Sequence, residues 1–290
     1  MRHCVCTAII SLVWCLKSVA AQTGLLVVAH GADSGWNDRV RATIGQVQWS
    51  HGPVALAFLM GPEAESAGWD HAVDVLLAGR VTAIIVVPLM VSSYGGHYRE
   101  IEYYSGLRDS MPGHTMRLRH HPLPVPARVT PALDSAAELG EALVTRWREL
   151  ATGDRARPLV LVAHGPTDSL DAARWVANLR AASVPFSGAG LREPPGVGLL
   201  WDDAKPEARA TAVAALRDTV NARASLARDS VVVLPVLISS GSIDREKLPR
   251  DLEGLPVRYL RASLAPLPPL ARWIERIAGQ ALASTPGQGR

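Results

Sequence analysis

Two histidines stand just beyond short runs of apolar, β-branched residues. His30 follows residues 24–29 directly, and His97 follows residues 83–87 after the segment 88–96. Both runs are too short and too β-rich for helices, so they are typical of strands buried on both faces inside a parallel sheet. Imidazole accepts a proton near neutral pH and binds borderline divalent metals. Because open α/β sheets keep their sites beyond the carboxyl ends of strands, we expect His30 and His97 to share one site.

A carboxylate near these histidines would help to accept protons or to bind metal. Glu100 lies three residues after His97, which places both on one face of a helix. We expect His30, His97 and Glu100 to be catalytic, with the two histidines as metal ligands. Further carboxylate candidates are Glu63, Glu65 and Glu102.

The segment that leads to His97 ends in Ser93, Tyr94, Gly95 and Gly96. Such a stretch interrupts regular structure and lets the backbone turn or approach a ligand closely. We expect these four residues to contact a bound molecule. Of the tyrosines nearby, one or two could line a pocket: Tyr94, Tyr98, Tyr103 and Tyr104.

The elements around these residues alternate between strands and helices, which indicates βαβ units and a parallel sheet. In the first half the expected strands are residues 24–29, 54–60, 83–87 and 115–121, and the expected helices are 34–48, 63–78, 98–110 and 131–151.

The pattern then starts again. Residues 158–165 repeat residues 24–31 with the same final His-Gly, and residues 231–241 repeat the strand before His97 with its proline and double serine. The proline-rich stretch 256–269 resembles residues 119–126. We therefore predict two similar doubly wound α/β domains from an internal duplication, residues 22–152 and residues 153–283, with a disordered tail at residues 284–290.

The first 21 residues have the pattern of a secretory signal peptide. A short basic start precedes an apolar run, and small residues follow at the spacing of a cleavage site. This pattern predicts export, with a periplasmic location; the alternative is a misassigned start and a cytoplasmic protein. All three cysteines lie in this segment, so disulfides and cysteine-based metal sites are excluded from the remaining chain.

The charge balance argues against an acidic polymer as partner. Arg2 and Lys17 lie in the signal segment, so the remaining chain has 28 basic residues against 27 acidic ones. We expect no nucleic-acid binding and no membrane span after cleavage of the signal. The chain has neither a P-loop nor a Gly-x-Gly-x-x-Gly motif after a strand, so we expect no nucleotide cofactor. A monomer or a homodimer fits these properties.

The strand followed by His-Gly, and the later strand with Pro-Leu and Gly-Gly-His, resemble the class II tetrapyrrole chelatases, which include sirohydrochlorin cobaltochelatases and ferrochelatases. The resemblance covers nearly the whole chain after the signal, in a long two-domain form. It implies an interdomain cleft in which His30 and His97 bind the metal and accept pyrrole protons. Asn37 matches an asparagine frequent in the family's first helix, and Gly31 follows the first histidine, so we expect both to contact the bound molecule.

Two departures from the family pattern matter. The family commonly has a glutamate at the end of its second strand, where this chain has Met60. The second half keeps His164 but has Gly241-Ser242-Ile243-Asp244 where the other histidine should be, so we expect one complete site, in the first half. His164 either is structural or faces the cleft from the other side.

The resemblance implies an enzyme that inserts Co²⁺, or alternatively Fe²⁺ or Ni²⁺, into a sirohydrochlorin-type tetrapyrrole without ATP. In this reading the divalent metal and the tetrapyrrole are both substrates. A second hypothesis is an exported protein that binds metal or tetrapyrrole without turnover, since the export signal and the missing glutamate favour it.

Overall fold

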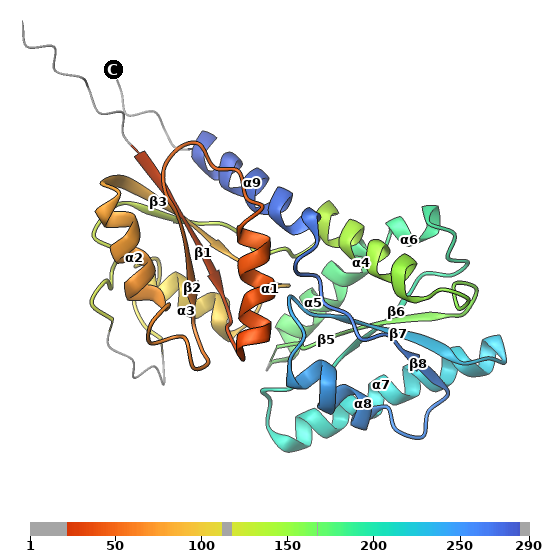
Figure 1. Cartoon of the computed structure of the whole chain (residues 1–290). Helices are drawn as coiled ribbons and strands as arrows, with labels where there is room; N and C mark the ends of the chain where they lie inside the picture. The colour runs from red at the N-terminus through yellow and green to blue at the C-terminus, as the bar shows by residue number, and fades with distance from the viewer. Residues whose placement is uncertain (1–21, 112–117, 167, 285–290) are drawn as a thin grey trace, which may run out of the picture.

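Eight parallel strands form two four-stranded sheets, one from each half of the chain, in a computed structural model that describes residues 22–111, 118–166 and 168–284 (Figure 1). The first sheet has the order β2-β1-β3-β4 and the second has the order β6-β5-β7-β8. The identical order confirms the predicted pair of similar α/β units. The strands are β1 (Gln22–Ala29), β2 (Val54–Phe58), β3 (Val81–Pro88), β4 (Ala127–Val129), β5 (Leu159–Ala163), β6 (Gly196–Leu199), β7 (Val231–Val236) and β8 (Val257–Tyr259).

Helices cover both faces of each sheet (Figure 1). They are α1 (Ser34–Ile44), α2 (Trp69–Ala78), α3 (Gly96–Tyr104), α4 (Ala137–Leu150), α5 (Ser169–Ala182), α6 (Pro185–Gly188), α7 (Pro206–Ala227), α8 (Leu248–Asp251) and α9 (Pro268–Ala283), with a π-helix, η1 (Ile243–Lys247), before α8. In both halves the first strand lies between the second and the third, so the strand order reverses beside β1 and beside β5. Such switch points are where open α/β sheets bind ligands.

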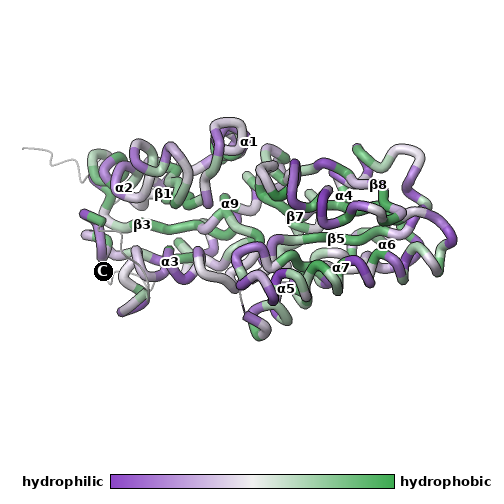
Figure 2. Tube along the Cα trace, turned by 90° about the horizontal axis from the view of Figure 1, so that it is seen from below, coloured by the Kyte–Doolittle hydropathy of each residue, from purple (hydrophilic) through white to green (hydrophobic). Residues whose placement is uncertain are grey.

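The central strands are buried on both faces, as their apolar runs predict. Leu25 and Val27 of β1 pack in one cluster of buried side chains, and Leu26 and Val28 pack in another on the opposite face. Figure 2 shows the strands as hydrophobic segments between layers of mixed polarity. The buried sheet gives a rigid base for the residues at its carboxyl edge.

The last helix of each half packs against the other half. Helix α4 follows β4 but contacts α5 and α6 of the second unit, and α9 follows β8 but contacts β3 and α1 of the first (Figure 1). The Trp147 and Phe186 rings lie edge to face at 5.6 Å in the first contact. In the second, Arg128 donates a hydrogen bond to the Ala281 carbonyl, 3.0 Å away. The two units are therefore joined by exchanged helices. The boundary between residues 152 and 153 stays a prediction.

All four helices of the first half are shorter than predicted, and α4 begins at Ala137 rather than at residue 131. Helix α1 ends at Ile44 rather than at residue 48, and α3 ends at Tyr104 rather than at residue 110, close to Gly106, which has a φ of +76°. Helix α2 begins only at Trp69, because the preceding segment turns at Gly68, where a side chain would overlap the carbonyl oxygen of Ala64. Glycines thus account for the end of α3 and the start of α2.

The fourth strand of the first sheet was misplaced by the sequence analysis. Residues 118–121 form turns and irregular structure, and residues 112–117 lie outside the described residues. The strand is Ala127–Val129, which pairs with Ile84–Val86 of β3. It is only three residues long and follows several prolines, so it has no periodic signal of its own. The repeat of Val257–Tyr259 is therefore this strand, and not residues 119–121.

The predicted signal segment lies outside the described residues, as does nearly all of the predicted tail. None of the helices within the described ranges combines the length and the apolar composition that a bilayer-spanning helix needs.

Candidate functional site

A cleft of about 390 Å³ lies between the two units, at the carboxyl ends of β1, β3, β5 and β7. This volume is within the usual range for small-molecule sites. Its walls are mainly apolar, with polar groups at a few positions. The polar lining includes His30, His97, Tyr98, His164, Asp202, Asp203 and Lys247.

The cleft brings the two predicted histidines together. His30 ends β1, and His97 lies in the first turn of α3, which follows β3. Their ring centroids are 4.8 Å apart and the rings meet edge to face at 82°. Residues 67 positions apart in the sequence thus form one pair.

Hydrogen bonds identify the tautomer of each ring. His30 Nδ1 lies 2.7 Å from the carbonyl oxygen of Gly31, which can only accept, so Nδ1 carries the proton. His97 Nδ1 lies 3.1 Å from a carboxylate oxygen of Glu100 and donates to it in the same way. In each neutral ring Nε2 therefore keeps the lone pair that can bind a metal or accept a proton.

The position of His30 favours its neutral form. Burial lowers its pKa below the ordinary value, and the neighbouring His97 lowers it further. The hydrogen bond to Gly31 and the more distant Asp203 act in the opposite direction but do not outweigh these effects. A neutral imidazole is the form that binds a metal, so the ring is ready to do so at neutral pH.

Glu100 orients His97. One carboxylate oxygen accepts from His97 and the other accepts a hydrogen bond from the hydroxyl of Tyr104. Burial and the Glu100 carboxylate raise the pKa of Tyr104 above the ordinary value, so the hydroxyl stays protonated and remains a donor. A carboxylate held in this way fixes the ring of a metal-binding histidine and increases its basicity.

The other carboxylates predicted near the histidines point elsewhere. Glu63 accepts hydrogen bonds from Asn37 and Arg41, which lower the pKa of its carboxyl group. Glu102 pairs with Arg108 on the surface, and Glu65 is exposed. Met60 lines the cleft at the end of the second strand. Of these carboxylates, Glu100 alone contacts either histidine.

The predicted binding residues divide into two groups. Gly95 and Gly96 line the cleft, and a side chain added at either would meet no atom within 4 Å. Gly31, Asn37, Ser93 and Tyr94 lie outside its lining. Asn37 is fully buried, and its side-chain oxygen accepts a hydrogen bond from the Ala32 amide at 3.0 Å, so it supports the turn after His30.

Ser93 and Tyr94 join the two units instead. The Ser93 hydroxyl donates to Asp134 at 2.6 Å, and Asp134 also accepts a hydrogen bond from Asn178 of α5 at 3.0 Å. The Tyr94 carbonyl oxygen accepts a hydrogen bond from the indole of Trp175, also on α5. These contacts hold the α3 side of the cleft against the second unit.

The second half makes the corresponding contact with the first: the loop after β7 packs against α1, as the loop after β3 packs against α5. The Ser239 hydroxyl, in the double serine after β7, donates to the carbonyl oxygen of Trp36 on α1 at 3.1 Å. Arg99 of α3 pairs with Asp171 near the start of α5, and Arg245 of η1 pairs with Asp33 at the start of α1. The matching arginines place Ile243, within the stretch 241–244 that lacks a histidine, where the first half has His97.

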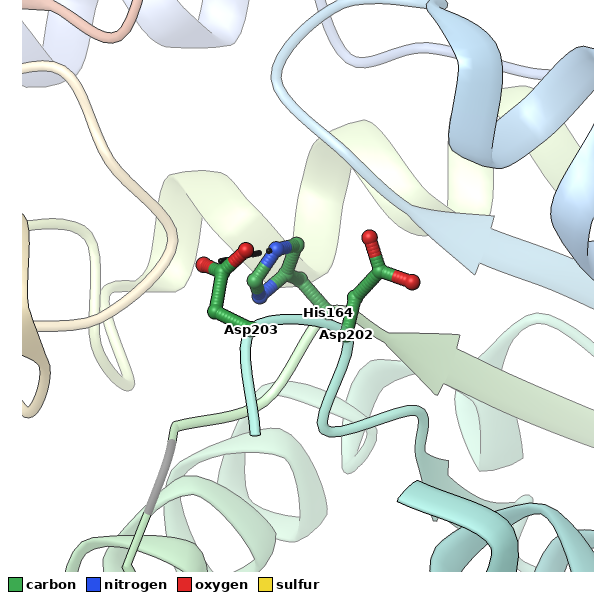
Figure 3. Close-up of side chains that lie close together, drawn as sticks. All are labelled: His164, Asp202 and Asp203. Carbon is green, nitrogen blue, oxygen red and sulfur yellow. Dashed lines mark ion pairs between the residues drawn. The ribbon is translucent and has the colours of Figure 1, made fainter. Parts of the chain in front are cut away.

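Asp202 and Asp203 were not predicted to belong to the site. They follow β6 and lie beside His164, which ends β5 (Figure 3). The internal duplication could have predicted these two aspartates. The end of β6 corresponds to the end of β2, where the chelatase pattern has a carboxylate. His164 lines the cleft, which decides between the two alternatives left open by the sequence.

Comparison with known proteins identifies relatives of this arrangement. The CbiX family model matches residues 24–150. Among solved structures, SirB from Bacillus subtilis with Fe³⁺ superposes with a TM-score of 0.62 and 15% identity, over 91% of this chain and 98% of that one. The sirohydrochlorin chelatase SirB from B. subtilis subspecies spizizenii, in complex with cobalt, gives a TM-score of 0.61 and 14% identity, over 92% and 98%.

A third solved structure shares the fold but is longer. DR2241 from Deinococcus radiodurans, a multi-domain protein with structural similarity to chelatases, gives a TM-score of 0.56 and 16% identity over 89% of this chain and 55% of that one. Comparison with curated protein sequences finds no significant match. The predicted chelatase-like two-domain fold is confirmed.

Proposed function

We propose that the chain is a class II chelatase, the family whose CbiX model matches residues 24–150, and that it inserts a divalent metal into a sirohydrochlorin-type tetrapyrrole. The observation that carries the proposal is the pair of imidazoles in the cleft, His30 and His97, 4.8 Å apart between ring centroids. We favour Co²⁺ as the metal, with Fe²⁺ and Ni²⁺ as alternatives, and insertion without ATP.

The chemistry requires two events that imidazoles can perform. The incoming metal must exchange water for protein ligands, and two pyrrole protons must leave the macrocycle. The Nε2 atoms of His30 and His97 bind the metal and, once it has moved to the macrocycle, accept protons. Glu100 accepts a hydrogen bond from His97 Nδ1 and so keeps the ring in the tautomer whose Nε2 faces the metal.

The site has few protein ligands, which suits a metal that must leave. Closed four-ligand sites retain their metal, whereas sites with open positions exchange ligands. The apolar walls, which include Trp36, Leu89 and Trp175, match the face of a flat macrocycle. The structures of SirB with Fe³⁺ and with cobalt support the choice of a first-row transition metal.

A multiple-turnover assay tests the proposal. Sirohydrochlorin and Co²⁺ are supplied in large excess over the protein, and insertion is followed by visible absorption against a reaction without protein. The proposal expects many equivalents of product per chain at a rate well above background. Product formation limited to the background rate, while metal or macrocycle still binds, would establish the second function below.

The second candidate function is binding of metal or tetrapyrrole without turnover, in an exported protein. The observation that favours it is Met60, a thioether at the position where the chelatase pattern has a glutamate. Export, with a periplasmic location, rests on the sequence pattern of residues 1–21. Mass spectrometry of the protein purified from its native host tests export, because cleavage predicts an N-terminus at or near Gln22.

A further inference from the structure

The wall of the cleft opposite the His30–His97 pair contains a second histidine site. His164 ends β5, and Asp203 lies in the loop after β6, with His164 Nε2 and an Asp203 carboxylate oxygen 3.3 Å apart (Figure 3). The Asp203 side chain is 59% exposed, so ions in the cleft can reach it. The pair lies near His30, because both residues influence its pKa.

The hydrogen bond of the other ring nitrogen of His164 shows which tautomer faces Asp203. His164 Nδ1 lies 2.8 Å from the carbonyl oxygen of Gly165, which can only accept, so Nδ1 carries the ring proton. In the neutral ring, Nε2 then has a lone pair directed at a carboxylate oxygen that also has only lone pairs. Two such atoms 3.3 Å apart repel each other unless a cation lies between or beside them.

The separation of the two atoms also suits a shared metal ion. A charge-assisted hydrogen bond from an imidazolium to a carboxylate is ~2.7–2.9 Å long, shorter than the observed separation. With metal–ligand distances of about 2.1 Å, a 3.3 Å separation of nitrogen and oxygen corresponds to an angle of about 105° at the metal. This angle lies between the octahedral and tetrahedral values.

The neighbouring Asp202 is close enough to suggest a third ligand, since its carboxylate lies within 4.8 Å of the other two groups. However, one of its oxygens is 2.5 Å from the Lys247 ammonium and the other is 3.2 Å from the Arg209 guanidinium. Both oxygens are therefore already neutralised. Asp202 fixes the loop after β6 and so positions Asp203.

We propose that His164 and Asp203 form a second divalent-metal site, with one nitrogen and one oxygen ligand, on the wall of the cleft opposite His30 and His97. Such a donor pair suits Co²⁺, Ni²⁺, Fe²⁺ or Zn²⁺. The remaining coordination positions face the cleft. The site needs no macrocycle, so it stands or falls independently of the insertion activity proposed above.

Cobalt binding to the full chain tests the site. In the double variant His30→Ala/His97→Ala, which removes the first pair, equilibrium dialysis against Co²⁺ should still find about one ion per chain. The visible absorption of the bound Co²⁺ reports its coordination. Adding Asp203→Asn or His164→Ala to that background should weaken the remaining binding at least about tenfold, because each removes one of two protein ligands.

Asp218→Asn is the matched control, because Asp218 is an exposed carboxylate on α7 of the same unit. In the same background it should leave Co²⁺ affinity unchanged. The proposal is overturned if the His30→Ala/His97→Ala protein binds no Co²⁺, or if its binding survives both Asp203→Asn and His164→Ala. Asp203 is exposed, so its replacement tests the site without endangering the fold.

Discussion

His30 and His97 acquire their chemistry from their neighbours. The Gly31 carbonyl and the Glu100 carboxylate each accept a hydrogen bond from Nδ1 of one ring, which leaves Nε2 with its lone pair in both. Burial and the proximity of the two rings disfavour the charged form of His30. The pair is therefore poised to bind a cation at neutral pH and to accept protons afterwards.

The pKa of His30 is measurable directly. NMR titration of the ring should give a midpoint below the ordinary value of 6.5, and His97→Ala should raise it, because a repulsive neighbour is removed. The sign for stability follows from linkage: as pH falls below 6.5 the unfolded state binds this proton more readily, so this contribution to stability is present above 6.5 and is lost as pH falls towards the folded pKa. A His30 midpoint above 6.5 would contradict this account.

Glu100 gives a second prediction for a single residue. Glu100→Gln should reduce Co²⁺ affinity or insertion rate by about 10- to 100-fold, the usual effect of losing the partner of a metal-binding histidine. Glu102→Gln is the control, since Glu102 lies on the same helix but pairs with Arg108. Equal activities for the two variants would mean that Glu100 has no role in orienting His97.

Among the elements, the turns that follow β1 and β5 pack closely against the ends of the neighbouring strands β2 and β6. Gly31 has a φ of +83°, and a side chain there would overlap the carbonyl oxygen of Met60 and lie 2.8 Å from the Cβ of Phe58. Gly165 repeats this conformation after His164, with a φ of +80°. Glycine is therefore required after each of these histidines for steric reasons, while the histidine itself provides the chemistry.

Replacement of Gly31 by alanine should destabilise the protein by about 3 kcal/mol or more, since backbone strain of about 1–2 kcal/mol adds to overpacking. Gly153 has nearly the same φ, +84°, but no atom lies within 4 Å of an added side chain. Gly153→Ala should therefore cost only the strain, about 1–2 kcal/mol. Urea unfolding compares the two; equal losses would show that the contact with Met60 is relieved.

The elements also show how far prediction from sequence extends. Apolar runs located the central strands, because a strand that is buried on both faces must be apolar along its whole length. Both histidines were then found at the ends of these runs. The strand Ala127–Val129 was missed, since three residues beside prolines have no periodicity and owe their pairing to β3. Asp203 was missed because its significance depends on a distance to His164 that only the folded chain creates.

At the scale of the whole molecule, the two halves complete each other. The apolar face of the first sheet that contains Leu25 and Val27 packs in one continuous core with residues of α9, while α4 packs on the second unit. The cleft lies between the halves, and reciprocal pairs such as Arg99 with Asp171 and Arg245 with Asp33 join its walls. Both walls therefore depend on the exchange of helices.

This exchange predicts the behaviour of an isolated half. The fragment 22–152 retains α4 but lacks α9, so the part of the sheet face that α9 covers is exposed, while α1 still packs on the same face. It should not form a stable monomer; we expect it to dimerise, with α4 of each copy in the place of α9. Sedimentation and chemical unfolding check this. A monomer that unfolds cooperatively at the stability of the full chain would show that α9 is dispensable.

The most direct test of the central claim is the initial rate of Co²⁺ insertion into sirohydrochlorin by the full chain, its His30→Ala/His97→Ala variant and a His120→Ala control. His120 pairs with Asp74 at 2.7 Å and does not line the cleft, so its loss should leave the rate near that of the unmodified protein. We predict that the double variant falls to the rate measured without protein while its circular dichroism spectrum is unchanged. A folded double variant that inserts cobalt as fast as the unmodified chain would contradict the claim.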